Sequence, residues 1–169
     1  GRIAAVWDKG KAALVEVEVT SAVFSATYHI FLPGLGGFGG ERGPSLAGGD
    51  PVVLSDTSTF ETAKDLAALY RLTGDRHPVH IDPEVAAANG FDRPILHGLC
   101  TVGIAVRTVA GHVGAHPADL AELDVRLAAP VLPGDTLEIA SGQGAGTVHF
   151  EARIGDKVVL SGGRARFGR

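Results

Sequence analysis

Apolar and polar residues alternate in two neighbouring segments near the start of the chain. In residues 12–20, valines at every second position alternate with glutamates and a threonine, and residues 24–30 repeat an apolar residue at every second position. This period is typical of half-buried strands. We expect an antiparallel pair, which needs further structure to lean on because two strands alone are marginally stable.

The next segments predict a loop and a helix. Residues 33–51 are crowded with glycine and bounded by proline, which predicts a linker or a wrapped surface loop. A phosphate-cradling loop is the less favoured alternative, because no Gly-Lys-Ser or Gly-Lys-Thr follows. Residues 59–62 read as a helix start, with Glu61 near the positive end of the helix dipole. Helical spacing continues at Leu66, Leu69 and Tyr70.

Two further helices are predicted in the middle of the chain. A short one runs from Pro83 to Asn89, because Asp82 can cap it and proline suits a first helical turn. Residues 99–110 are apolar around nearly the whole helix circumference, which indicates a buried helix.

Strand patterns fill the remainder of the chain. They lie near residues 122–129, 136–141, 147–154 and 157–167. Gly155-Asp156 and Pro133-Gly134-Asp135 predict tight hairpin turns. Since no alternating strand–helix–strand pattern occurs, we predict an α+β fold in which an antiparallel sheet wraps a central buried helix.

Composition narrows the class of protein. The chain has 169 residues, 45% of them hydrophobic, which suffices for one well-cored domain, and its net charge of −4 disfavours nucleic-acid binding. A single cysteine, Cys100, excludes an intrachain disulfide framework and favours a reducing compartment. No apolar run reaches the ~20 residues of a membrane span, so we expect no membrane partner and a cytoplasmic location.

Candidate chemistry is concentrated between residues 75 and 101. Asp75 and His80 are joined by a loop in which Pro78 forces an extended residue before it, so both side chains can face one point. Such a pair suits general acid/base work on water. Gly98, at the start of the buried helix, offers an unobstructed N–H as an oxyanion site. The alternative is that Asp75 caps a turn and His80 is a hydrogen-bonded core histidine.

The stretch from Tyr70 to Gly103, YRLTGDRHPVHIDPEVAAANGFDRPILHGLCTVG, resembles the signature of the MaoC-like, or type 2, (R)-specific enoyl-CoA hydratases. The family pattern Gly-Asp-x-Asn-Pro-Leu-His matches Gly74 to His80 at five of six specified positions, counting valine for leucine. His77 departs from it, since the family usually has asparagine there. Residues 36–44 are similar to the stretch that joins the halves of double hot-dog members.

This resemblance implies a hot-dog fold and a division into two parts. Residues 1–48 would be the last strands and linker of an incomplete N-terminal hot-dog half, and residues 49–169 a catalytic MaoC-like half. The absence of methionine and the start at Gly1 fit this interpretation of the chain as part of a longer protein. A homodimer, or pairing with the missing half, is expected.

The implied activity is reversible hydration of a trans-2-enoyl-CoA to a (3R)-3-hydroxyacyl-CoA in fatty-acid β-oxidation. Asp75 and His80 would be the catalytic dyad and Gly98 the oxyanion donor. Further substrate-binding positions are Arg76, His77, Pro78, Val79 and Leu127. No cofactor is expected, because CoA is part of the substrate. The alternatives are a dehydratase of 3-hydroxyacyl thioesters on acyl carrier protein, and a non-catalytic acyl-CoA-binding subunit.

Other polar residues in this region have more ordinary interpretations. Asp75, His77, His80 and Asp82 could be drawn as metal ligands, but no cysteine pair or HExxH helix supports this and we predict no metal. Cys100 is interpreted as a small buried hydrophobe. His97 is expected to pack or cap beside Gly98. Arginines available to the CoA phosphates are Arg42, Arg93, Arg164 and Arg166.

Overall fold

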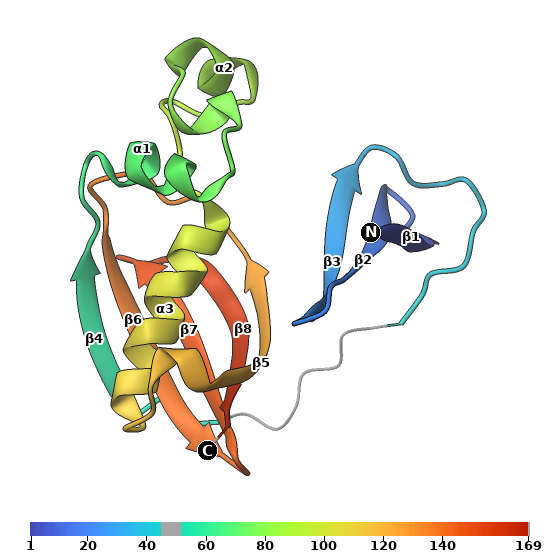
Figure 1. The fold of residues 1–169 in the computed structure, drawn as a ribbon. Helices are drawn as coiled ribbons and strands as arrows, with labels where there is room; N and C mark the ends of the chain where they lie inside the picture. The colour runs from blue at the N-terminus through green and yellow to red at the C-terminus, as the bar shows by residue number, and fades with distance from the viewer. Residues whose placement is uncertain (45–51, 169) are drawn as a thin grey trace. The chain divides into compact units, whose positions relative to one another are not determined.

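The computed structural model describes residues 1–44 and 52–168. The chain divides into two compact units, Gly1–Ala47 and Gly48–Arg169, and each is considered by itself (Figure 1).

The first unit is a three-stranded antiparallel sheet. Its strands are β1 (Arg2–Asp8), β2 (Ala12–Thr20) and β3 (Ser25–Pro33), in that order. The predicted pairing of β2 with β3 is confirmed, with Val15 opposite Ile30 and Val19 opposite Ala26. Strand β1 was not predicted, because its apolar residues run consecutively rather than alternating.

A buried carboxylate organises the glycine-rich loop that follows β3. Asp8 is 6% exposed. Its Oδ1 accepts hydrogen bonds from the N–H groups of Gly10 and Gly37 at 2.8 and 2.9 Å, and its Oδ2 accepts one from Gly39 at 2.8 Å. The loop therefore cradles the chain's own carboxylate, which argues against the phosphate-cradling alternative. The predicted loop residues 45–51 lie outside the described part.

These bonds predict an acid transition in the first unit. The N–H of Gly37 above all, joined by that of Gly10, lowers the pKa of Asp8. A depressed folded-state pKa contributes stability above the ordinary carboxyl value of about 3.9, and this contribution is lost as the pH falls through the folded value. Fluorescence of Trp7, the single tryptophan, should therefore report loosening of the unit in that acid range.

Asp8→Asn should weaken the unit at neutral pH and remove the transition. Asp156→Asn, in a turn of the second unit, is the control, and an unchanged profile in Asp8→Asn would contradict the expectation.

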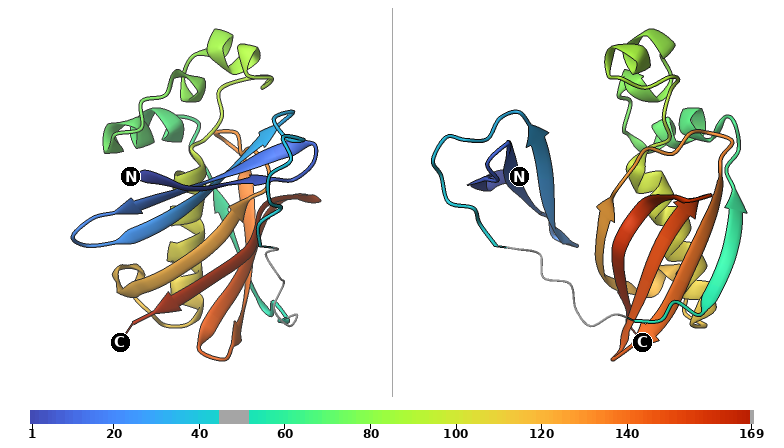
Figure 2. Two further views of the ribbon diagram at one scale, coloured as in Figure 1. Left: turned by 90° about the vertical axis from the view of Figure 1, so that its right-hand side faces the viewer. Right: turned by 180° about the vertical axis from the view of Figure 1, so that it is seen from behind.

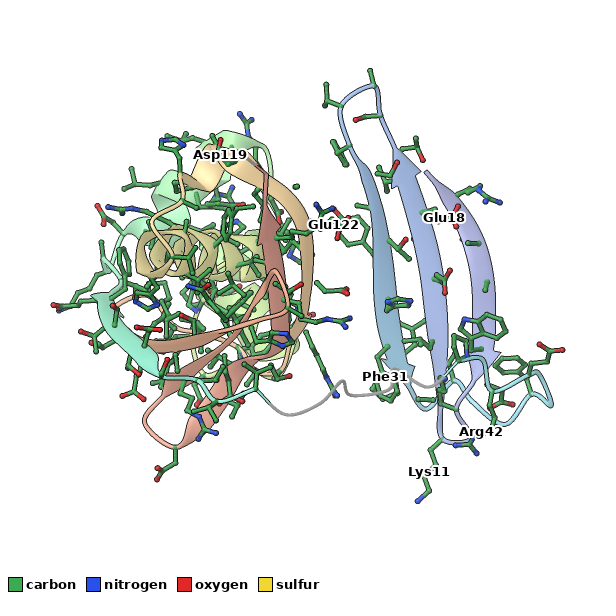
Figure 3. All side chains as sticks on the ribbon, turned by 90° about the horizontal axis from the view of Figure 1, so that it is seen from below. Lys11, Glu18, Phe31, Arg42, Asp119 and Glu122 are labelled. Carbon is green, nitrogen blue, oxygen red and sulfur yellow. The ribbon has the colours of Figure 1, made fainter. Side chains whose placement is uncertain are left out.

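The second unit wraps one long helix in a five-stranded antiparallel sheet. The strands are β4 (Asp56–Glu61), β5 (Leu120–Leu127), β6 (Thr136–Gly144), β7 (Thr147–Ile154) and β8 (Lys157–Phe167), in the order β4-β6-β7-β8-β5. Helix α3 (Gly98–His112) lies within the curve of the sheet (Figures 2 and 3). The predicted α+β arrangement of a sheet around a central buried helix is confirmed.

The predicted helix start at residues 59–62 is wrong. This stretch belongs to β4 and to the bend after it, and β4 pairs with β6 so that Phe60 lies opposite Leu137. Residues Thr57 to Phe60 are β-branched, small or aromatic, and pairing at the sheet edge outweighs the weak capping signal. The helix begins only at Leu66, as α1 (Leu66–Tyr70).

The predicted turn at residues 133–135 is present, but the strands before and after it do not pair with each other. It leads into β6, whereas β5, the strand before it, pairs with β8. The hairpin between β6 and β7 is formed instead by Ala145 and Gly146, both with positive φ. The predicted turn at Gly155-Asp156 does join β7 to β8.

Helix α3 supplies the centre of the core. Buried side chains of the helix meet Leu137, Ile139, Phe150 and Leu160 of the sheet. Cys100 is 6% exposed, and burial raises the pKa of its thiol, which agrees with its interpretation as a small buried hydrophobe. No helix within the described ranges is long and apolar enough to span a bilayer.

Short helical segments gather at the end of the sheet where α3 begins (Figure 1). They are α1, the 3₁₀ turns η1 (Arg71–Thr73) and η2 (Pro78–His80), and α2 (Pro83–Ala88). The side chain of Asp82 caps α2 as predicted, accepting from the N–H groups of Glu84 and Val85. A further 3₁₀ turn, η3 (Pro117–Asp119), precedes β5.

Candidate active site

Local hydrogen bonds shape the loop that carries Asp75 and His80. Gly74 has a φ of +125°, a conformation open to glycine, and turns the chain after η1. Oδ1 of Asp75 accepts from the N–H of His77 at 3.1 Å. The guanidinium of Arg71 donates to the carbonyls of Arg76 and His77 at 2.9 and 3.1 Å. Arg71, which the sequence did not single out, thus clamps the loop from the preceding turn.

The loop brings Asp75 and His80 face to face. Nε2 of His80 lies 3.9 Å from Oδ2 of Asp75, and the two side chains are 10% and 56% exposed. On its other side, Nδ1 of His80 lies 2.9 Å from the carbonyl oxygen of Ile95. Because a carbonyl can only accept, Nδ1 carries the proton, and in the neutral ring Nε2 presents a lone pair toward Asp75.

Asp75 is held in its ionised form. The hydrogen bond from the His77 N–H lowers the pKa of Asp75, and the imidazoles of His97, His80 and His77 act in the same direction while burial opposes them. Asp75 therefore faces His80 as a carboxylate, not as a proton donor.

His97 is the third member of the cluster. It is 1% exposed, and its ring stacks on that of His80 with centroids 3.6 Å apart and planes 22° apart. Its Nε2 lies 3.1 Å from the backbone oxygen of Asp75. The expectation that His97 packs beside Gly98 is confirmed, but its side chain makes no capping hydrogen bond. The position of His97 directly before a buried helix is visible in the sequence, but this signal did not group His97 with Asp75 and His80.

Helix α3 begins at Gly98, as predicted, and no side chain caps its first turn. The side chains of His77, Asp82 and His116 cap η2, α2 and η3, whereas the side chain of His97 is turned to Asp75 instead. The first N–H groups of a helix have no partner within it. A Cβ added at Gly98 would lie 2.5 Å from Cδ1 of Leu127, so the side chain of Leu127 covers the glycine.

An apolar cavity of about 320 Å³ opens beside Gly98. Its lining includes Phe91, Ile95, Gly98, Thr101 and Leu127. Ile95 also binds His80 through its carbonyl, which places the cavity next to the dyad. A larger, open hollow of about 700 Å³ lies at the other end of α3, among Val113, His116 and Gly144, away from the Asp75–His80 pair. The smaller cavity is the candidate substrate site because it is lined by Gly98 and by Ile95, whose carbonyl lies within hydrogen-bond distance of His80.

The other predicted substrate-binding positions occupy different environments. Nδ1 of His77 accepts from the N–H of Val79 at 3.2 Å, so the histidine caps η2. An asparagine Oδ1 occupies the equivalent place along the side chain, which explains how histidine can replace it. Arg76 and Pro78 are exposed, while Val79 is buried and its carbonyl accepts from the N–H of Ile95. A substrate-binding role for these residues stays a prediction.

One group of possible metal ligands exists among the described residues, and it differs from the one drawn from the sequence. Asp75, His80 and His97 place ligand atoms within 4.8 Å of one another, whereas His77 caps η2 and Asp82 caps α2. A metal must lie near the plane of each imidazole that binds it. The rings of His80 and His97 are stacked face to face, so their lone pairs do not converge on one ion. The donor geometry does not favour a metal.

Two of the arginines considered for CoA already have acidic neighbours. Arg164 pairs with Asp124 at 2.7 Å, and Arg166 pairs with Glu122, both across β8 and β5. Arg42 and Arg93 remain the other two candidates.

An antiparallel sheet wrapped around a single central helix is the arrangement of a hot-dog protein. The chain belongs to the MaoC-like family, since the family described as "MaoC like domain" matches residues 48–160.

Individual relatives agree with this assignment. The chain is 37% identical over 177 residues to a "Peroxisomal multifunctional enzyme type 2" of Drosophila melanogaster, covering 96% of this chain and 29% of that protein. It is 40% identical over 149 residues to an enoyl-CoA hydratase of Mycobacterium tuberculosis, covering 82% and 51%. A solved MaoC-like dehydratase from Phytophthora capsici superposes with a TM-score of 0.83 at 31% identity, covering 99% of this chain and 61% of that one. The chain thus spans about half the length of these relatives, or less in the first case.

Proposed function

We propose that this chain catalyses the reversible hydration of a trans-2-enoyl-CoA to a (3R)-3-hydroxyacyl-CoA, with Asp75 and His80 acting on water. The observation that carries the proposal is the orientation of His80. Its Nδ1–H is bound to Ile95, and the lone pair on Nε2 is directed toward the ionised Asp75 at 3.9 Å. That separation exceeds a direct hydrogen bond but lets one water molecule contact both groups.

In the proposed hydration, the carboxylate of Asp75 accepts one hydrogen bond from the water and orients it. Nε2 of His80 takes the other proton as the water oxygen forms its bond to C3 of the enoyl thioester. The C2–C3 π electrons move toward the carbonyl, and the imidazolium of His80 returns the proton to C2. The net change is addition of one water, and dehydration is the same path in reverse.

The open N-terminus of α3 is the proposed partner of the thioester oxygen. Negative charge develops on that oxygen as the enolate forms, and the N–H of Gly98, supported by the helix dipole, can stabilise it. The apolar cavity beside Gly98 would receive the acyl chain, with Leu127 at its mouth.

A single enantiomer would follow if water is delivered from one face of the bound enoyl chain, and 3R is the one that the resemblance to (R)-specific hydratases implies. The dyad lies on the loop beside the cavity, so a chain held in the cavity with its carbonyl at Gly98 presents a single face to His80. Relatives named as enoyl-CoA hydratases support the reaction class.

The direct test is an assay with thioesters of two lengths. Crotonyl-CoA and a longer enoyl-CoA should lose the absorbance of the conjugated thioester, and chiral analysis of the product should give the 3R enantiomer. Absence of hydration at every chain length would overturn the enoyl-CoA hydratase proposal, and a 3S product would overturn the stereochemical part.

The dehydratase direction on carrier-protein thioesters is the second candidate. It is favoured by 39% identity over 151 residues to a "3-hydroxyacyl-thioester dehydratase Y" of Mycobacterium tuberculosis, covering 80% of this chain and 51% of that protein. Comparing kcat/KM for CoA and acyl-carrier-protein thioesters of one acyl chain separates the two. A non-catalytic acyl-CoA-binding subunit would bind ligand with no turnover in either assay.

The remaining expectations keep the status of predictions. We propose that the reaction uses no cofactor beyond the CoA of the substrate, and that the chain works as a homodimer or paired with another hot-dog half. A cytoplasmic location stays a prediction, and relatives include proteins named as peroxisomal.

A further inference from the structure

His97 contacts both members of the dyad without facing the proposed substrate. Its ring contacts those of Tyr70, with centroids 4.7 Å apart, and His80, with centroids 3.6 Å apart. Its Nε2 reaches the backbone oxygen of Asp75. One buried side chain therefore touches the ring of His80 and the backbone of Asp75, which come from opposite ends of the loop.

The protonation of His97 follows from its neighbours. The carbonyl of Asp75 can only accept, so Nε2 of His97 carries the proton. Burial lowers the pKa of His97, and the nearby His80 and Arg71 lower it further, while the bond to the Asp75 carbonyl and the Asp75 carboxylate oppose them. The ring is therefore neutral near pH 7, and among the described residues its buried Nδ1 has no hydrogen-bond partner.

We propose that His97 is a positioning residue for the dyad. Its stacked ring fixes the plane of His80, so that Nε2 stays directed at Asp75, and its Nε2–H fixes the backbone from which Asp75 projects. The inference rests on the proposed hydration for its effect on rate, but the orientation of His80 can be observed without any activity.

The neutral state of His97 is part of this role. In the proposed reaction His80 becomes a cation, and a charged ring stacked at 3.6 Å would repel it. The other ionisable groups near the pair are the Asp75 carboxylate, the Arg71 guanidinium, the Tyr70 phenol at a centroid distance of 4.7 Å from His97, and His77 at 6.3 Å from His80. A neutral His97 offers His80 an uncharged, flat surface that tolerates the charge change.

Nitrogen NMR of the histidine side chains in the unmodified protein tests this placement. As the pH falls, His97 should remain neutral, with the proton on Nε2, to a lower pH than the usual histidine midpoint of about 6.5. In its neutral form, His80 should carry its proton on Nδ1. Protonation of His97 at the usual midpoint, or a neutral His80 with its proton on Nε2, would overturn the proposal.

Two substitutions separate the two contacts of His97. His97→Gln retains an N–H donor at the reach of Nε2 and removes the ring, whereas His97→Phe retains a flat ring and removes the donor. Each should lower kcat by up to about 100-fold with little change in KM, as expected when reacting groups lose alignment. His97→Gln should also let neutral His80 exchange its proton between Nδ1 and Nε2. His149→Gln, on β7, is the control.

The outcomes distinguish this inference from the proposed function. If His97→Gln and His97→Phe are both folded and keep kcat within about twofold of the unmodified chain, with the His80 tautomer unchanged, the positioning role is wrong. If the unmodified chain has no hydratase activity, the hydration proposal fails, while the NMR comparison still decides whether His97 orients His80. If one variant does not fold, the other variant and the spectrum of the unmodified protein decide.

Discussion

Asp75→Asn is expected to lower kcat/KM for enoyl-CoA hydration by about 10³-fold, within the usual range for a lost acid/base group. Asparagine keeps an oxygen that can accept the N–H of His77, so the loop should retain its shape. What is lost is the negative charge facing Nε2 of His80, which orients water and stabilises the imidazolium. The measurement is the initial rate of absorbance loss with crotonyl-CoA, together with the melting temperature.

Asp82→Asn is the matched control for this substitution. Asp82 lies seven positions further along the same segment and also accepts an N–H two residues ahead, from Glu84 at 2.9 Å. It caps α2, and among the described residues its side chain makes no hydrogen bond or ion pair with His80, so its amide variant should retain near-normal activity. If both variants lose activity equally, the loss is due to altered folding of the segment. If Asp75→Asn keeps full activity, Asp75 is not a member of the catalytic dyad.

Gly98→Ala is expected to lower kcat/KM by about 10²-fold, the scale on which one oxyanion donor acts. The added methyl group would lie 2.5 Å from Cδ1 of Leu127 and would push that side chain aside at the point where the thioester oxygen is proposed to approach. Alanine has a higher helix propensity than glycine. Any fall in the melting temperature should therefore come only from the steric contact with Leu127. Steady-state kinetics should place the loss mainly in kcat.

Two companion variants make this result interpretable. Gly103→Ala lies in the same helix with nothing within 4 Å of the added Cβ, and it should leave the rate unchanged. In Gly98→Ala combined with Leu127→Ala, the contact with Leu127 is relieved while the methyl group still stands beside the N–H. The rate should stay low, and recovery in the double variant would assign the effect to Leu127 rather than to the oxyanion site.

The sequence was a good guide where local chemistry and burial agree. Strand β7 follows a strict alternation of apolar and polar residues, parts of β2 and β3 do so as well, and α3 follows from an apolar surface on nearly all sides. The cap of α2 by Asp82 followed by Pro83 is also a local signal. These elements are determined by neighbours within a few residues, so their patterns can be read along the chain.

Elements whose partners lie far away were harder to predict. The stretch at 59–62 resembles a helix start by composition, yet the β4 part of it is a strand because β6, about 75 residues later, pairs with it. The turn at 133–135 looks like a hairpin turn, yet β5 pairs with β8 on the other side of the unit. The glycine-rich loop looks suited to an external anion, yet Asp8 supplies the anion from β1.

The candidate site likewise combines features predicted from local sequence with features set by long-range contacts. The identity and spacing of Asp75, His80 and Gly98 along the chain already pointed to water activation beside a helix N-terminus. Their mutual orientation depends on contacts that no local pattern carries: the carbonyl of Ile95 sets the tautomer of His80, and Leu127 covers Gly98. His97 reaches back 22 positions to the backbone of Asp75 while stacking on His80. The candidate reacting residues could therefore be predicted from the sequence, whereas which of their atoms face one another required the tertiary structure, because long-range hydrogen bonds and ring stacking fix those atoms in place.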